Sequence, residues 1–215
     1  MNLTFHTPGG IEGESMRIIQ QELEDMGITL EPDCADVVRR AIHTTADFDY
    51  AKNLVFTPGA AAAGAAALRS GTPIVTDTNM ARSGINQKAC AQFGVERFCY
   101  MADQEVAQLA KEHGTTRAVA AVDRWAQEHP NAIFAVGNAP TALLRMCELM
   151  EAGKLRPALV IAVPVGFVNV VESKEAMLAL CRKQNVPAIV AMGRKGGSTV
   201  AAAICNALLY RTFQR

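Results

Sequence analysis

The stretch that decides the fold reads ALVIAVPVGFV and spans residues 158–168. Its first six residues are apolar and rich in branched side chains, which is typical of a strand that is buried on both faces of a sheet. Pro164 and Gly166 then interrupt the apolar run, as expected where a loop leaves the end of a strand. The stretch therefore predicts a short central strand followed by a loop at the edge of a sheet.

The same pattern recurs along the chain. Near-continuous apolar strands that alternate with helices indicate a buried, mostly parallel sheet with helices on both faces. Because crossovers between parallel strands are right-handed, the expected fold is a doubly wound, three-layer α/β/α sandwich. The other predicted strands lie at 53–56, 73–76, 95–101, 132–136 and 188–192, and helical segments include 86–93 and a region from 104 to 128.

The first 50 residues follow a different pattern. They contain two helical segments, at about 12–26 and 33–42, and no strand-like run. We expect a single domain over 1–215, in which residues 1–50 form an N-terminal helical arm and residues 51–215 form the doubly wound core.

The composition narrows the class of protein. The 21 Lys and Arg residues balance the 21 Asp and Glu residues, so there is no overall bias toward nucleic acid or anionic membranes. The uncharged run at 158–171 is shorter than the ~20 residues that a membrane-spanning helix needs, and Pro164 and Gly166 interrupt it. The six cysteines form no C-x-x-C pair and the N-terminus lacks a signal-peptide pattern, so we expect reduced thiols and a cytoplasmic location.

Polar or glycine-bearing loops follow five of the predicted strands. In an open parallel sheet, ligands bind outside the carboxyl ends of the strands, so these loops predict a binding edge. Thr141 and Ser198 are expected to help cap the helices that follow them. The loops lie at 57–59, 77–79, 137–141, 164–167 and 193–199.

The motif GRKGGST at 193–199 does not have the spacing of a nucleotide-binding phosphate loop, because Lys195 precedes the paired glycines. No G-x-G-x-x-G fingerprint opens the first strand–helix unit and no G-x-S-x-G elbow is present, so nucleotide enzymes and hydrolases are disfavoured. Arg194 and Lys195, beside free backbone N–H groups, still favour a carboxylate or phosphate ligand.

Arg40 and His43 are three residues apart at the end of the second helical segment. If the helix extends through His43, the two side chains share a face and suit the binding of an anionic substrate and the transfer of one proton. A structural role for the histidine stays open on the residues alone. A metal site formed with Asp47 and Asp49 is disfavoured because no second histidine lies nearby.

Taken in order, these segments resemble the precorrin-8X methylmutases of corrin biosynthesis, and the resemblance covers nearly the whole chain. HTTADFD at 43–49 and GRKGGS at 193–198 are closer to the branch of the family that acts on cobalt-precorrin-8. The departure is Asn169-Val-Val171, where the family usually carries smaller residues, so these positions are left out of the site. The matching stretches are 14–19, 42–49, 76–86, 137–143, 164–168 with 172–174, and 193–198.

The resemblance implies an isomerase that moves a methyl group from C-11 to C-12 of cobalt-precorrin-8, by an acid/base-assisted 1,5-sigmatropic shift that gives a cobyrinate-type product. Such a rearrangement requires no nucleotide or methyl donor, so no cofactor and no protein metal site are expected, and any cobalt belongs to the substrate. The implied partners are a polycarboxylate tetrapyrrole and a second copy of the chain in a homodimer. The alternatives are a tetrapyrrole-binding handover protein without turnover and the same rearrangement on metal-free precorrin-8X.

By the same resemblance, His43 is the catalytic acid/base, Ser15 and Arg40 contact the substrate, and Arg117 is a basic residue of the same pocket. Asp47 and Asp49 are left with two possible roles, to orient the imidazole or to cap the loop. Six further substrate-binding positions are predicted mainly from their place at strand ends, namely Asp77, Asn79, Gly137, Asn138, Thr141 and Arg194.

Overall fold

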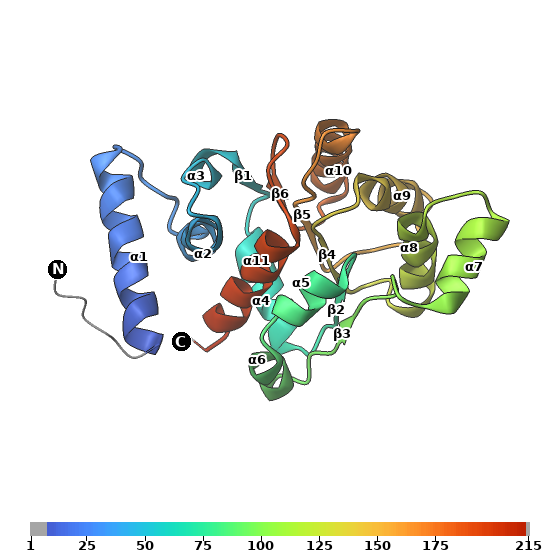
Figure 1. Ribbon diagram of the computed structural model, residues 1–215, viewed down its shortest axis with the longest axis horizontal. Coiled ribbons are helices and arrows are strands. Elements are labelled where there is room, and N and C mark those ends of the chain that lie inside the picture. The colour runs from blue at the N-terminus through green and yellow to red at the C-terminus, as the bar shows by residue number, and fades with distance from the viewer. Residues whose placement is uncertain (1–7, 214–215) are drawn as a thin grey trace.

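A six-stranded sheet lies at the centre of the molecule, between two layers of helices (Figure 1). The computed structural model describes residues 8–213. The strands have the spatial order β1-β6-β5-β4-β2-β3, and all neighbours are parallel except β1 and β6, which are antiparallel. The strands are β1 (Leu54–Phe56), β2 (Ile74–Thr76), β3 (Arg97–Phe98), β4 (Ile133–Val136), β5 (Leu159–Ala162) and β6 (Ala188–Ala191).

Successive residues of the central strands point to opposite faces of the sheet and are fully buried on both. In β4, Ile133 belongs to one hydrophobic cluster and Phe134 to the other, and in β5 the same holds for Leu159 and Val160. A strand with two buried faces needs apolar side chains at every position, which explains the continuous apolar runs in the sequence. The predicted three-layer α/β/α sandwich is confirmed.

Two groups of helices cover the two faces. The four helices between β3 and β6 that form one layer are α7 (Gln104–Glu112), α8 (Arg117–Glu128), α9 (Pro140–Glu151) and α10 (Val170–Gln184). The opposite layer contains α4 (Ala60–Arg69), α5 (Asn79–Gly84), α6 (Gln87–Gln92) and α11 (Ser198–Arg211), together with the N-terminal helices α1 (Pro8–Asp25), α2 (Ala35–Thr45) and α3 (Tyr50–Asn53). None of the helices within residues 8–213 is long and apolar enough to span a membrane.

Several local predictions need correction. Helix α5 was not predicted, although Thr78 provides its N-cap and accepts a hydrogen bond from the amide of Ala81 at 3.1 Å. The predicted strand at 95–101 is reduced to two residues at the sheet edge. Neither Thr141 nor Ser198 caps its helix, because the N-cap positions are Ala139 and Gly197. The hydroxyl of Ser198 instead lies 2.8 Å from that of Thr78.

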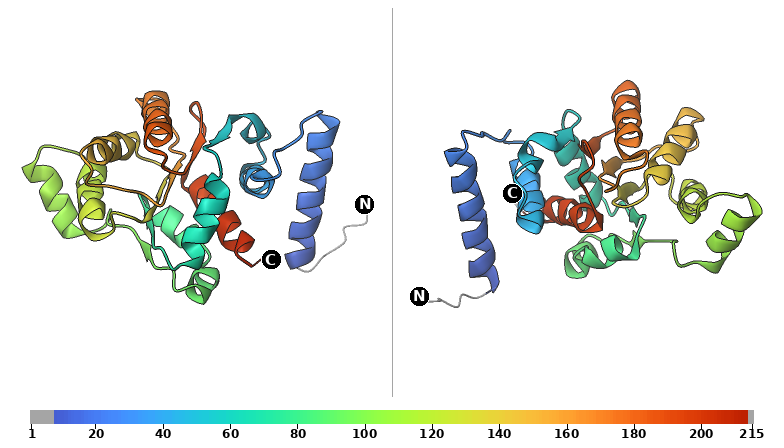
Figure 2. Two further views of the ribbon diagram at one scale, coloured as in Figure 1. Left: turned by 180° about the vertical axis from the view of Figure 1, so that it is seen from behind. Right: turned by 45° about the horizontal axis from the view of Figure 1, so that its top comes forward.

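The two long N-terminal helices differ in how they meet the rest of the molecule. Helix α2 buries Val37, Val38, Ala41 and Ile42 and packs along α11. Helix α1 lies outside α2, at the opposite end of the molecule from α7 (Figures 1 and 2). The predicted boundary at residue 50 is therefore not a packing boundary, because α2 belongs to the helical layer and only α1 projects from it.

The packing of α2 predicts that its inward face contributes to the stability of the whole fold. Ile42 is 1% exposed, and its replacement by alanine should lower the free energy of unfolding by about 2–5 kcal/mol. Ile18 on α1 is 43% exposed, and Ile18→Ala should change it by only about 0.5 kcal/mol. Urea denaturation of both variants measures the difference, and equal midpoints would contradict the placement of α2 in the core.

Candidate active site

The loops after β2 and β4 are joined by one buried carboxylate. Asp77 is 1% exposed, and its two oxygens accept hydrogen bonds from the amides of Gly137 (2.8 Å), Asn138 (2.8 Å) and Ala139 (2.7 Å). Burial raises the pKa of Asp77 above its ordinary value, and the three N–H groups oppose that rise. The carboxylate thus holds the loop after β4 against the end of β2.

The loop after β6 is in close contact with the loops that follow β4 and β5. The amide of Gly197 donates to the carbonyl of Val163 at 2.8 Å. A Cβ atom at Gly196 would lie 2.1 Å from that same carbonyl oxygen, and one at Gly137 would lie 2.8 Å from Cα of Ser198. Gly137 and Gly196 are therefore required by the close approach of three backbone segments at the carboxyl edge of the sheet.

The buried side chain of Lys174 holds the same loop through hydrogen bonds to its backbone. Lys174 on α10 is fully buried, and its ammonium donates hydrogen bonds to the carbonyls of Gly193 and Lys195, both at 2.8 Å. Burial lowers the pKa of Lys174 to about 8. The sequence interpretation missed this role, although Lys174 occupies a position in the inward stripe of α10, between Val170 and Met177, where an apolar residue is expected.

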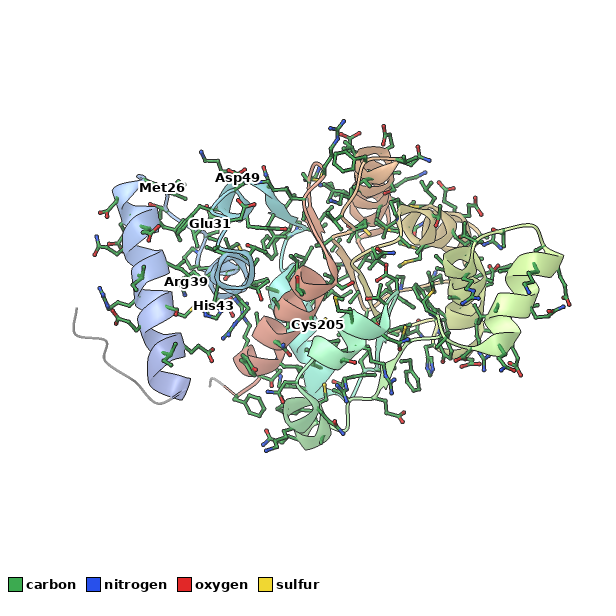
Figure 3. The ribbon with its side chains drawn as sticks, in the orientation of Figure 1. Met26, Glu31, Arg39, His43, Asp49 and Cys205 are labelled. Carbon is green, nitrogen blue, oxygen red and sulfur yellow. The ribbon has the colours of Figure 1, made fainter. Side chains whose placement is uncertain are left out.

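His43 lies in the last turn of α2, and its side chain is exposed. Within residues 8–213 its imidazole makes no hydrogen bond or ion pair, and its exposure leaves it accessible to a ligand. Figure 3 shows His43 and Arg39 projecting from α2, with Asp49 on the segment that follows the helix. The helix does extend through His43, which places it one turn from Arg40 on the same face, as predicted.

Arg40 connects α2 to α1 through an ion pair with Glu12. A guanidinium nitrogen of Arg40 lies 2.6 Å from a carboxylate oxygen of Glu12, and the group stacks over the ring of Tyr210 at 5.1 Å. Ser15 is one turn beyond Glu12 on α1, and its hydroxyl donates to the carbonyl of Ile11 at 2.9 Å. The structure thus brings Ser15, Arg40 and His43 to one region.

The two aspartates after α2 bind a lysine from the loop after β6. The ammonium of Lys195 lies 2.7 Å from Asp47 and 2.5 Å from Asp49. This hydrogen bond lowers the pKa of Asp47 below its ordinary value. Asp47 also accepts a hydrogen bond from the amide of Asp49 at 3.0 Å. Their role is therefore to fold the loop and to hold Lys195, and within the described residues neither contacts the imidazole of His43.

The remaining predicted residues lie along the rim. Asn79 and Asn138 are exposed at the ends of β2 and β4. Arg194 is exposed, with its guanidinium 5.4 Å from the ring centroid of Phe167, a side chain that is itself 82% exposed. Thr141 lies beside Thr116, their hydroxyls 3.4 Å apart, next to Arg117 at the start of α8.

Arg117 is not brought together with His43 by the fold of one chain. Helix α8 packs against α7 and α9, whereas α2 packs against α1, α3 and α11. Two of the other predicted substrate-binding residues, Asp77 and Gly137, are buried. The carboxylate of Asp77 accepts a hydrogen bond from the amide of Gly137, so within the chain these two groups shape the rim of the site.

Comparison with known proteins decides the family. Residues 10–211 match the family model of precorrin-8X methylmutase. The chain belongs to the precorrin-8X methylmutase family. Methylmutases are isomerases, so the predicted enzyme class and the predicted assignment to cobalamin biosynthesis are confirmed at the level of the family.

Relatives of known name agree with this assignment. The chain is 42% identical to the cobalt-precorrin-8 methylmutase of Priestia megaterium, over 94% of this chain and 87% of that protein. It is 49% identical to the cobalt-precorrin-8 methylmutase of Salmonella typhimurium, over 81% of this chain and 80% of the relative. The solved structure of the precorrin-8X methylmutase from Thermus thermophilus superposes with a TM-score of 0.85 at 41% identity and covers 94% of this chain and 97% of its own.

No group of three or more His, Cys, Asp or Glu side chains within residues 8–213 is arranged to hold a metal ion.

The hydrogen bonds of Asp77 predict a measurable contribution to stability. Asp77→Asn replaces one acceptor oxygen by an N–H donor that faces a backbone N–H group. The variant should lose about 1.5–3 kcal/mol of unfolding free energy at neutral pH, the range for hydrogen bonds to a charged group. Asp25→Asn is the matched control, because Asp25 is exposed on α1. Chemical denaturation that finds the two variants equally stable would contradict this role.

Proposed function

We propose that this chain moves a methyl group from C-11 to C-12 of cobalt-precorrin-8, with His43 as the proton donor. The observation that carries the proposal is the geometry of α2, where an accessible imidazole and a guanidinium lie one turn apart on the same face. The names of the relatives from Priestia megaterium and Salmonella typhimurium support the choice of substrate.

The proposed reaction is intramolecular. The bond between the methyl carbon and C-11 breaks as the bond to C-12 forms, so substrate and product have the same atoms. His43 lends a proton to the conjugated ring and recovers it after the shift, as general acid/base catalysis requires. The step consumes no methyl donor, oxidant or cofactor, and cobalt enters and leaves as part of the substrate.

Cations along the rim would hold the carboxylates of the ring. Arg40 is bound to Glu12 and lies over Tyr210, so its guanidinium is already oriented at the region of His43. Binding of a substrate carboxylate would require an exchange with Glu12, whose side chain is 46% exposed and free to turn toward water. Arg194 presents a second exposed cation beside the apolar ring of Phe167.

Replacement of the histidine tests the reaction directly. His43→Ala should bind the tetrapyrrole with little change in affinity and convert it at least about 100-fold more slowly, because general acid catalysis contributes roughly that much or more. His113→Ala is the control, since His113 is an exposed histidine at the end of α7. Conversion is followed by the visible spectrum of the ring.

Three outcomes separate the alternatives. Normal turnover by His43→Ala would contradict the role of the histidine. Tight binding without any spectral change in the wild-type protein would identify a handover protein. Equal or faster conversion of the metal-free ring would favour precorrin-8X as the substrate, the name carried by the relative from Pseudomonas aeruginosa that is 37% identical.

We also propose that the chain is a homodimer, as the family resemblance implies, and that it is cytoplasmic, as its scattered cysteines favour. A second copy offers a way to bring Arg117 to His43, since the two lie on helices that do not pack together within one chain. If so, mixed dimers of His43→Ala and Arg117→Ala subunits should regain part of the activity that each variant lacks, because one site in such a dimer is intact. Light scattering that finds a monomer, or mixing without any gain, would contradict this assembly.

A further inference from the structure

The loop after β6 and the end of helix α2 come from opposite ends of the chain, yet they meet at one lysine. Lys195 bridges Asp47 and Asp49, which follow His43 by four and six residues. Both aspartates belong to the short connection between α2 and α3. The side chain of Lys195 is therefore the point at which the rim of the sheet contacts the segment that ends the His43 helix.

The backbone around Lys195 is held in place by contacts with neighbouring segments. Its carbonyl accepts a hydrogen bond from the buried ammonium of Lys174, and the adjacent Gly196 fits closely against the backbone of Val163. The neighbouring carbonyl of Arg194 accepts a hydrogen bond from the amide of Gly166 at 3.2 Å. Three independent contacts thus fix the backbone at Lys195 and its two neighbours.

On the other side of the contact, the chain forms a tight turn at the end of α2. Helix α2 ends at Thr45, and the residue after it, Ala46, has the left-handed backbone conformation with φ of 53°. The chain therefore turns sharply at Ala46, three residues after His43, and the hydroxyl of Thr45 donates to the carbonyl of Ala41 at 2.8 Å just before this turn. A shift of this turn would move the imidazole.

We propose that Lys195 is a positioning residue for the reaction, which sets the place of His43 by holding Asp47 and Asp49 to the rim of the sheet. This inference rests on the proposed role of His43. Lys195 does not touch the imidazole and acts only through the connection between α2 and α3. Its two ion pairs raise the pKa of Lys195, so the ammonium stays charged throughout the neutral range.

The test compares Lys195→Met with the wild-type enzyme. Methionine keeps most of the length of the side chain and removes the charge. The expected result is a fall in kcat of about tenfold to a hundredfold with KM unchanged, because a misplaced catalytic group slows the chemical step without weakening binding. Lys195→Arg should restore most of the rate, and Asp47→Asn combined with Asp49→Asn should reproduce the loss. Lys183→Met, an exposed lysine on α10, is the matched control.

A second measurement does not depend on the reaction. Amide hydrogen exchange across residues 44–50 should be faster in Lys195→Met than in the wild-type protein and unchanged in Lys183→Met. If the wild-type protein converts no tetrapyrrole, the proposed function fails, and the exchange rates still report whether Lys195 holds this segment.

Two results would overturn the inference. A rise in KM with kcat unchanged would mean that Lys195 binds a substrate carboxylate and does not position the histidine. Unchanged kcat, KM and exchange rates in Lys195→Met would mean that the ion pairs have no influence on the end of α2.

Discussion

Close backbone contact at the carboxyl edge of the sheet is the constraint on which the rest of the site depends. Four loops converge there, and they fit only because Gly137 and Gly196 have no side chains and because Asp77 supplies acceptors for three amides at once. A side chain at either glycine would separate the loops, and the cations of the last loop would move with it. The packing of the backbone therefore determines the shape of the rim and the positions of its charged side chains.

The sequence predicted the layers of the fold well because the signal is strong where burial is complete. Strands such as β4 and β5 are buried on both faces, so every position must be apolar and the run is easily recognised. Prediction failed where an element is too short to show a clear hydrophobic pattern in the sequence. Helix α5 has only six residues, and the edge strand β3 has two residues that are only partly buried, so neither carries a full periodic pattern.

For the site, the sequence identified candidate residues by their chemical type but did not identify the residues that they contact. It placed Arg40 and His43 on one helical face, and the structure agrees, because that relation depends only on local helix geometry. It could not find the tie between Lys195 and Asp47, which are 148 positions apart in the chain. It also read Asp77 as a ligand-binding group, since nothing in the sequence distinguishes an exposed carboxylate from one that is turned inward to bind backbone amides.

The proposed function depends on the rearrangement of a tetrapyrrole within a single molecule. The most direct measurement is a single-turnover incubation of the purified protein with cobalt-precorrin-8 that carries ¹³C in the methyl group at C-11. We expect a product of unchanged mass in which the labelled carbon is attached to C-12. Substrate recovered with its label still at C-11, although bound to the protein, would contradict the claim.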